Sequence, residues 1–413
     1  MSVKPTIKEV FENAVQQKMI PGAVLTARDR AGKLRYSETF GVHSLKTSQP
    51  LKPDAVFWLA SCTKLMVTVA ALQCVERGLF TLDEDFTRIL PEWKDKEILA
   101  GFEEVDGKQE PIFRKNTTPI TLRHMLSHQS GISYDHFNPL LIQYRTLEGK
   151  SFALDRSGHV TVNYNYPLIF APGESWSYGS NVDWAGIAIS RTNNNISLEE
   201  YMIKNIWKPL GMNDTTFRLR DRPDLAARIP DMNQREGKID PMFGVTLNPS
   251  GKAIHSDNPV WNTNPDDDYG GCGGYSTAPD FQKLLDSLTA NDGKVLNKTT
   301  VDEMFKSQLT EGAKQALAGA LAIPQVNNVL GGGYGGGTKM SWGLGGLLNE
   351  DELESGRAPG SICWFGLPCL YWWIDIKKGV SGTYFSQLFP PGDPQSNELM
   401  VKFEKYVYER LEA

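Results

Sequence analysis

The spacing of apolar residues in the first third of the chain predicts a helix, two strands and a second, buried helix. Residues 6–18 repeat apolar side chains three or four positions apart, which is the spacing of one helical face. The run 23–27 is strand-like, and a glycine-containing turn returns the chain through a second strand at 34–41. The long apolar stretch 63–77 predicts a helix that ends at Gly78 and is buried on most sides.

The pattern changes twice in the rest of the chain. From about residue 82 to residue 300, helical segments alternate with loops rich in Pro, Gly and Asn. Strand-like runs then return at 340–347, 369–376 and 380–388, and an amphipathic helix follows at about 397–411. We therefore predict an α+β fold in which an antiparallel sheet flanked by helices, from residues 1–82 and 300–413, is split by a mainly helical domain, residues 83–299.

Composition and charge exclude several classes of protein. The 413 residues are 40% hydrophobic and 22% charged, which excludes a disordered or fibrous chain. Because the 49 acidic residues outnumber the 43 basic ones and the sequence has no Lys/Arg block, no nucleic-acid partner is expected. No apolar run approaches 18 residues and the first ten residues lack a signal-peptide core, so we expect no membrane span and a cytoplasmic location. The five cysteines contain no Cys-x-x-Cys pair and are expected to be reduced thiols.

The segment Ser61-Cys62-Thr63-Lys64 is a candidate for nucleophilic chemistry. A serine and a lysine three positions apart share one helical face, so the amine can reach the hydroxyl and act as the base that a serine nucleophile needs. The first turn of the helix adds backbone N–H groups where an oxyanion would develop. The alternative interpretation is a serine that only caps the helix.

Tyr178 is the second candidate, because it stands where a loop, 172–180, leads into a helical segment. Its phenol oxygen can act as a base or proton relay coupled to Lys64. A tyrosine packed in the core is the alternative interpretation. Together the two motifs favour covalent acyl transfer through Ser61.

With these motifs in place, the chain resembles the serine β-lactamase and penicillin-binding-protein-like hydrolases of class C type. The resemblance rests on an ordered set of segments: Ile20-Pro21-Gly22-Ala23, Ala60-Ser61-Cys62-Thr63-Lys64, residues 121–131, the Tyr178 segment, residues 209–215 and residues 270–280. Within this group the chain is most similar to the fungal lovastatin-type polyketide acyltransferases, or transesterases, through residues 71–79, 179–186 and 387–394.

The resemblance implies roles for individual residues. Ser61 would be the nucleophile, Lys64 its base, and Tyr178 the general base and acid for the acceptor or leaving group. Tyr134 would lie in a wall of the acyl pocket, and Asn181 would contact substrate, although it follows Tyr178 by three positions where the family has two. No cofactor and no metal are expected, since His124 and His128 lack the remaining ligands of a zinc motif.

The chain departs from the family at the third motif, normally Lys-Thr-Gly or His-Thr-Gly on an edge strand. The corresponding segment is Trp364-Phe365-Gly366-Leu367-Pro368, so the cation that would bind an acidic substrate is missing. The strand can still supply an oxyanion-hole N–H from Gly366 or Leu367, paired with the N–H of Ser61. Trp364 and Phe365 suit a hydrophobic substrate unless they belong to the core.

These observations predict a ping-pong acyltransferase of secondary metabolism, with its active site at the domain boundary. An acyl group would pass from a thioester, on coenzyme A or an acyl carrier protein, through Ser61 to a hydroxyl of a small, polyketide-like acceptor. An acidic carrier protein would meet a basic rim to which Arg114-Lys115, Arg145 or Arg156 could contribute. Two alternatives stay open: an esterase or β-lactamase-like serine hydrolase, and a non-catalytic or repurposed small-molecule-binding protein.

Overall fold

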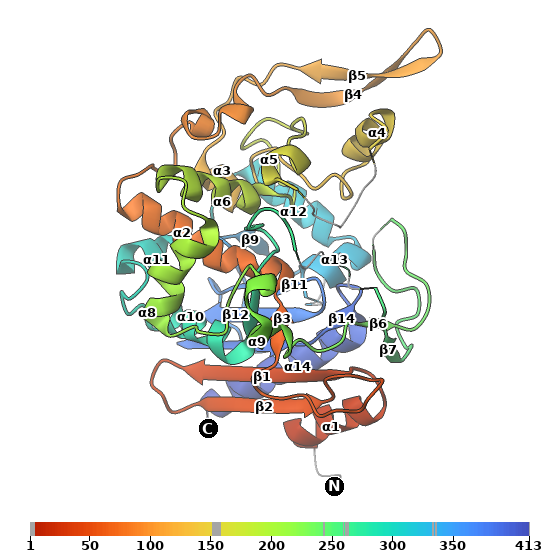
Figure 1. The fold of residues 1–413 in the computed structure, drawn as a ribbon, viewed down its shortest axis with the longest axis vertical. Helices are drawn as coiled ribbons and strands as arrows, with labels where there is room; N and C mark the ends of the chain where they lie inside the picture. The colour runs from red at the N-terminus through yellow and green to blue at the C-terminus, as the bar shows by residue number, and fades with distance from the viewer. Residues whose placement is uncertain are drawn as a thin grey trace.

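A seven-stranded antiparallel sheet forms the centre of the molecule in the computed structural model, which describes residues 5–150, 158–242, 244–258, 260, 264–332, 334 and 337–412 (Figure 1). The strand order is β2-β1-β13-β12-β11-β10-β9. The strands are β1 Gly22–Asp29, β2 Arg35–Gly41, β9 Met340–Trp342, β10 Leu347–Asn349, β11 Ile362–Gly366, β12 Leu370–Asp375 and β13 Val380–Phe385. The sheet therefore combines the two ends of the chain, as the sequence predicts.

The register between β1 and β13 joins these two ends. Val24 pairs with Phe385 and Asp29 with Val380, and β1 pairs on its other side with β2. Every one of the six residues of β12 and of β13 is buried, because helices cover both faces of the sheet at this point.

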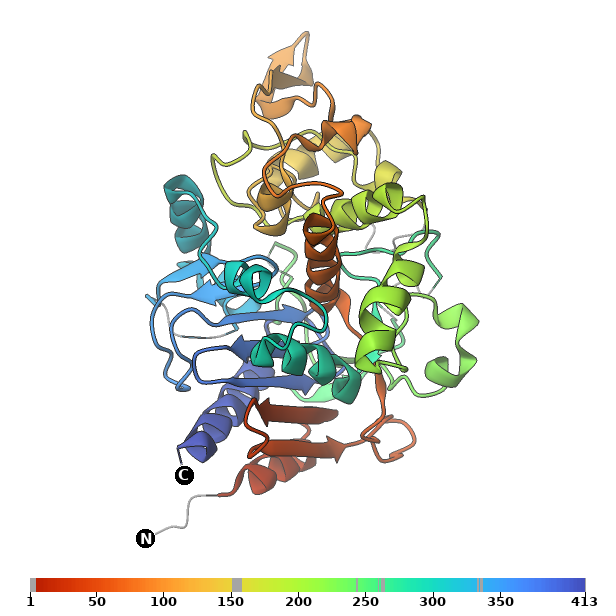
Figure 2. The same cartoon turned by 90° about the vertical axis from the view of Figure 1, so that its left-hand side faces the viewer.

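Neighbouring residues of one strand pack on opposite sides of the sheet. Trp372 contacts Phe281 of α10, Ala278–Ala290, whereas Trp373 contacts Phe403 of α14, Pro394–Leu411. Successive side chains of a strand point to opposite faces, so two adjacent tryptophans serve two layers. The helix α1, Ile7–Gln16, packs beside α14, and Figure 2 shows α10 on the sheet face toward the viewer.

The long helix α2, Thr63–Glu76, connects the sheet to the helical part of the molecule, and twelve of its fourteen residues are buried. It ends before Gly78, whose φ of 69° gives the left-handed conformation that the sequence predicts there. The helices that follow are α3 Leu122–Leu126, α4 Pro139–Leu147, α5 Val160–Asn163, α6 Asn181–Thr192, α7 Leu198–Met202, α8 Lys208–Leu210, α9 Pro223–Ala226, α11 Lys298–Met304, α12 Glu311–Leu321 and α13 Pro324–Leu330. None of the described helices is long and apolar enough to cross a membrane.

Short strands also lie outside the central sheet, and those between residues 83 and 299 fall in the region predicted to be mainly helical. The short strands are β3 Val56–Trp58 paired with β8 Tyr275–Thr277, β6 Asn233–Arg235 paired with β7 Ala253–His255 and β14 Leu388–Phe389, and the hairpin β4 Ile98–Val105 with β5 Lys108–Arg114. This hairpin projects from the end of the molecule farthest from α1 (Figure 1). Its turn, Asp106-Gly107, has positive φ at both residues, and an Asp-Gly pair is a strong hairpin signal that periodicity alone does not register.

The run 340–347 differs from the prediction of one continuous strand. It forms two paired strands, β9 and β10, separated by a turn in which Gly345 has φ of 91°. No disulfide links the five cysteines, all of which lie within the described ranges. The α+β fold is confirmed, and we propose the predicted division into residues 1–82 with 300–413 and residues 83–299.

Candidate active site

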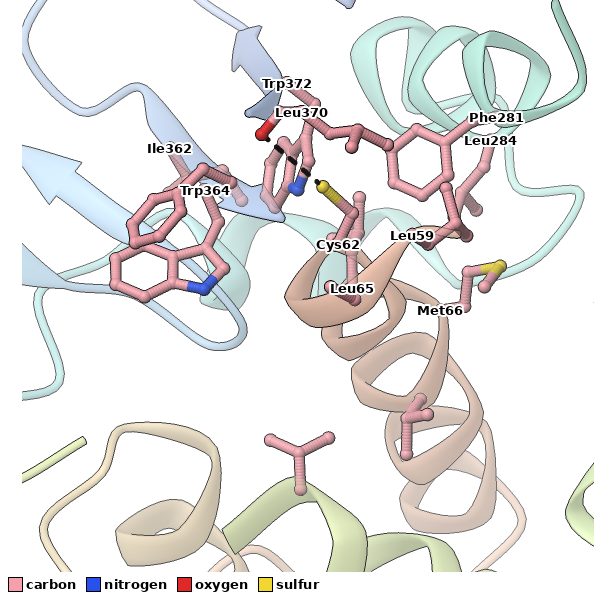
Figure 3. Packing of buried hydrophobic residues seen from close by; sticks show 14 of the residues in the cluster. Leu59, Cys62, Leu65, Met66, Phe281, Leu284, Ile362, Trp364, Leu370 and Trp372 are labelled. Atoms are coloured by element: carbon pink, nitrogen blue, oxygen red, sulfur yellow. Dashed lines mark hydrogen bonds between the residues drawn. The ribbon is translucent and has the colours of Figure 1, made fainter. Parts of the chain in front are cut away.

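Ser61 lies in a 3-10 turn, Ala60–Cys62, directly before α2. Ala60 has φ of 44°, a left-handed conformation that costs energy for any residue other than glycine and that persists where surrounding contacts enforce it. Cys62 supplies such contacts, since it is fully buried with its Sγ 3.9 Å from the carbonyl oxygen of Leu370. Figure 3 shows Cys62 pointing into the apolar cluster between the sheet and α10. The buried Cys62 side chain therefore holds the turn in place, while Ser61 is only half-buried.

Lys64 follows one helical turn later, and only 1% of its surface is exposed. Its Nζ donates hydrogen bonds to Ser61 Oγ at 3.3 Å, to the Tyr134 hydroxyl at 3.2 Å and to the Gly271 carbonyl at 2.7 Å. These partners satisfy the hydrogen-bonding capacity of the nitrogen, which would otherwise be costly to bury. The amine is thus within hydrogen-bond reach of the predicted nucleophile.

Tyr134, predicted as a pocket wall, places its hydroxyl in this polar cluster. Burial, with a smaller contribution from the negative charge of Asp183, raises the pKa of Tyr134 well above its ordinary value. The side chain is therefore a neutral phenol at physiological pH, which accepts the hydrogen bond from Lys64 and keeps its own proton to donate.

Tyr178 packs beside Tyr134, with ring centroids 5.6 Å apart, and Lys64 Nζ lies 4.7 Å from the centre of the Tyr178 ring. Trp364 Nε1 donates a hydrogen bond to the Tyr178 hydroxyl at 3.1 Å. A donor aimed at a phenol oxygen stabilises negative charge on that atom. Trp364, predicted as an apolar wall, therefore has a polar contact that depends on tertiary packing.

His128 and Asn181 form the layer behind Tyr178. The rings of His128 and Tyr178 are 4.7 Å apart, and His128 Nδ1 accepts a hydrogen bond from the Gly179 N–H at 3.4 Å and lies 3.1 Å from Asn181 Nδ2. Burial, followed by the nearby Lys64 charge, lowers the pKa of His128 well below its ordinary value, so the ring is neutral. Asn181 also accepts a hydrogen bond from Ser130 and is fully buried. Its side chain is therefore hydrogen-bonded within the protein.

The strand β11 lies against the turn that carries Ser61. A Cβ on Gly366 would lie 2.3 Å from the Leu59 carbonyl oxygen, so this close approach requires glycine. The family motif is described for an edge strand, but β11 pairs with both β10 and β12. Phe365 and Leu367 line the same cavity as Ser61, and the N–H groups of Gly366 and Leu367 stay candidates for the oxyanion hole.

Two cavities meet at Tyr178. The smaller one, about 90 Å³, is lined by Ser61 together with the aromatic side chains of Trp58, Tyr134, Tyr164 and Phe365. The larger one, about 770 Å³, is lined mainly by apolar residues of α4, α12, α13 and the loop at 241–242. Both cavities share the lining residues His136, Phe137, Tyr178, Val329 and Leu330.

The resemblance places residues 136–141, like Tyr134, among the walls of the acyl pocket, and the His136 side chain lines both cavities. The sequence assigns this side chain no individual role, because no spacing motif connects it to Ser61. Within the described part of the chain, no group of three or more His, Cys, Asp or Glu side chains is placed to hold a metal ion.

A serine in the turn before a buried helix, a lysine one helical turn later and a tyrosine from the helical part form the arrangement that the sequence predicts for a serine site of the β-lactamase type. The family model described as Beta-lactamase matches residues 7–404, and the chain belongs to this family.

Several fungal proteins are similar to this chain over almost their whole length. Monacolin J acid methylbutanoyltransferase from Aspergillus terreus is 35% identical over 97% of this chain and 95% of its own length. Lovastatin esterase from Penicillium rubens is also 35% identical, over 98% of both chains. A solved mutant of simvastatin synthase from Aspergillus terreus superposes with a TM-score of 0.88 at 35% identity, covering 98% of this chain and 94% of that one. The predicted resemblance to fungal acyltransferases of this type is confirmed.

Proposed function

We propose that this protein is a serine acyltransferase of secondary metabolism, which carries an acyl group on Ser61 and passes it to a hydroxyl of a polyketide-like acceptor. The observation that carries the proposal is the contact of Lys64 with Ser61 in a cavity that shares Tyr178 with a large apolar cavity. Kinship to a protein named for methylbutanoyl transfer to monacolin J acid supports this choice of acyl group and acceptor.

In the first half-reaction Ser61 Oγ attacks the carbonyl carbon of a thioester while Lys64 Nζ accepts the hydroxyl proton. The carbon–sulfur bond breaks without help from an acid, and the released thiolate then takes the proton of the Tyr178 hydroxyl and leaves as a thiol, so that Tyr178 remains as the phenolate. The backbone N–H of Ser61 and that of Gly366 or Leu367 would bind the oxyanion of the intermediate. The product is an ester on Ser61 whose acyl group occupies the smaller cavity.

In the second half-reaction Tyr178 accepts the proton of the acceptor alcohol, whose oxygen attacks the ester carbonyl. The bond to Ser61 Oγ breaks, and the serine recovers its proton through Lys64. The Trp364 N–H supports this step because it stabilises the phenolate, which is the form of Tyr178 that can accept a proton. The larger cavity offers room for a bulky, mostly apolar acceptor.

The carrier of the thioester, coenzyme A or an acyl carrier protein, is part of the same proposal. Ion pairs within the protein reduce the positive charge of the predicted basic rim, since Arg114 pairs with Glu174 and Arg145 with Asp135. Arg156 lies outside the described residues. A carrier protein that docks here would therefore compete with these pairs or use other contacts.

A serine hydrolase is the second candidate, and the similarity to the lovastatin esterase of Penicillium rubens favours it. The chemistry would be the same up to the acyl-enzyme, with water in place of the alcohol. The large apolar cavity argues for the transferase, because a bound acceptor fills the space from which water would attack.

Intact-protein mass spectrometry tests the proposal. The wild type and a Ser61→Ala variant are incubated with the N-acetylcysteamine thioester of methylbutanoic acid, then chased with buffer or with monacolin J acid. We expect a Ser61-dependent mass increase that persists in buffer and disappears when the alcohol is added.

Rapid loss of the acyl mass in buffer would identify a hydrolase instead. If the wild type acquires no acyl mass from this or other short thioesters and esters, the acyl-enzyme mechanism fails, and a non-catalytic binding protein becomes the better explanation.

A further inference from the structure

The imidazole of His136 lies where the two cavities meet, and it belongs to the lining of both. Its ring stacks on Tyr134 with centroids 5.5 Å apart and contacts Phe137 at 4.3 Å. Because Tyr134 is in turn bonded to Lys64, His136 is one ring removed from the catalytic cluster. A substrate that spans the two cavities would therefore pass this side chain.

A buried carboxylate fixes the orientation of His136. The Asp135 side chain is 1% exposed, and its Oδ1 lies 3.2 Å from His136 Nδ1. The other oxygen of Asp135, Oδ2, accepts a hydrogen bond from the Tyr166 hydroxyl at 3.0 Å and pairs with Arg145 Nε at 3.3 Å. Asp135 is also balanced by Arg145, so when the imidazole ring carries both protons, Nδ1–H is directed at Asp135 and Nε2–H is the donor left for an anionic ligand.

The lining of the two cavities contains few ionisable side chains, so the nitrogen of His136 is the basic group that a ligand there would meet. Among the described lining residues of both cavities, His136 is the only basic side chain, and none is an Asp or Glu. The cation that relatives in the wider family carry on the third motif is replaced by Trp364 and Phe365. A carboxylate entering this apolar space would lose its hydration and would need a directed, charge-assisted hydrogen bond in return.

We propose that His136, oriented by Asp135, binds a carboxylate group of the acceptor and so determines that the enzyme prefers acidic alcohols over their neutral esters. The inference rests on the proposed function, in which the larger cavity receives the acceptor. It moves the anion-binding role from β11 to the segment between α3 and α4. In this assignment His136 is a specificity-determining residue, and Asp135 is a positioning residue.

Binding measurements on the Ser61→Ala protein test the inference without turnover. Monacolin J acid and its methyl ester serve as probes, and their dissociation constants are measured by calorimetry. We expect the acid to bind at least about tenfold more tightly than the ester, the size of one charge-assisted hydrogen bond. Adding His136→Gln should weaken binding of the acid about tenfold and leave that of the ester within twofold.

The matched control is His159→Gln. His159 also pairs with an aspartate, its Nδ1 lying 3.0 Å from Asp267 Oδ1, but it is exposed and lines neither cavity. This variant should bind both probes as the parent does. Thermal melting verifies that each variant is folded, and the comparison of acid with ester on the parent protein needs no substitution at position 136.

Equal binding of acid and ester by the parent protein, equal weakening of both by His136→Gln, or no measurable binding of the acid would overturn the inference. Failure of the proposed function has a different signature, because acylation of Ser61 by a thioester requires no acceptor. A protein that forms the acyl-enzyme but does not distinguish acid from ester retains the function and loses the inference.

Discussion

At the scale of single residues, one indole N–H determines the environment of the Tyr178 hydroxyl. Trp364 donates to the phenol oxygen, while Lys64 lies near the ring and bonds to Ser61. In the proposed mechanism the two half-reactions therefore depend on different contacts. Acylation would use the pair Ser61 and Lys64, and transfer to the alcohol would use Tyr178 with its indole partner.

Replacing the donor should separate the two half-reactions. In Trp364→Phe the ring remains but the hydrogen bond to Tyr178 is lost, so we expect transfer to slow by about tenfold or more while acylation changes little. Single-turnover mass spectrometry measures both rates. Trp342→Phe is the control, because Trp342 packs 4.6 Å from Trp364 but donates to the Leu126 carbonyl. An equal loss in both rates would show that the indole only supports packing.

His128 is expected to make stability depend on pH. Its folded-state pKa is lowered, so below about pH 6.5 the unfolded chain binds a proton that the folded chain excludes. Its contribution is complete above that pH and declines below it, by up to about 1.4 kcal/mol per pH unit, and His124, whose pKa is also lowered, adds to the effect. Urea unfolding between pH 5 and pH 8 measures the slope.

The variant His128→Asn should flatten this slope, since asparagine tolerates the positive φ of 60° at this position and does not titrate. His159→Gln is the control, because the hydrogen bond and charge of Asp267 raise the pKa of His159, the opposite direction. A slope that His128→Asn leaves unchanged would assign the pH dependence to other groups.

At the scale of elements, β11 and the turn that carries Ser61 are held in contact at Gly366. Nine of the ten residues from Leu59 to Thr68 are buried, all except Ser61, so the turn has little room to move away from the strand. The strand thus acts through its backbone, which explains how the family's usual side chains can be replaced without losing the wall of the site.

We expect Gly366→Ala to lower the melting temperature and to abolish acylation, because the added Cβ would meet the Leu59 carbonyl at 2.3 Å. Thermal melting and acyl-enzyme yield are the measurements. Gly319→Ala in α12 is the matched control: nothing lies within 4 Å of its Cβ, and alanine should stabilise the helix by about 0.5–1 kcal/mol. Normal acylation by Gly366→Ala would show that the strand and the turn can move apart to accommodate the added Cβ.

At the scale of the whole molecule, the arrangement of two cavities separates donor from acceptor chemistry. Val326 on α13 lines only the larger cavity, so Val326→Trp should leave acylation by a short thioester unchanged and slow transfer to a bulky alcohol by about tenfold or more. Chase experiments with monacolin J acid and with water measure the balance. Gln325→Trp, exposed on the same helix and outside the lining, should behave as the parent does. Slower acylation in Val326→Trp would contradict the separation.

Much of the fold follows from local patterns. The predicted helices at 6–18, 63–77 and 397–411 correspond to α1, α2 and α14, because an apolar stripe or an apolar run fixes both the element and its buried face. The hairpin β4–β5 and the break between β9 and β10 were not predicted, because each depends on turn residues within segments whose periodicity is weak or ambiguous.

The sequence by itself determined that Ser61 and Lys64 are neighbours. Three positions separate them across the 3-10 turn and the start of α2, so local geometry brings the hydroxyl and the amine within 3.3 Å. The same holds for membership of the family, which ordered motifs along the chain define.

Only the tertiary structure decided which distant groups complete the site. Trp364 is 186 positions from the tyrosine to which it donates. His136 is oriented by a buried aspartate, Asp135, that no motif connects to Ser61. From the sequence, the aromatic residues of β11 could belong either to the core or to a pocket wall, because both environments favour apolar side chains. Which of them presents an N–H to Tyr178 depends on how the sheet packs against the helical part, and a pattern of local spacing carries no information about that packing.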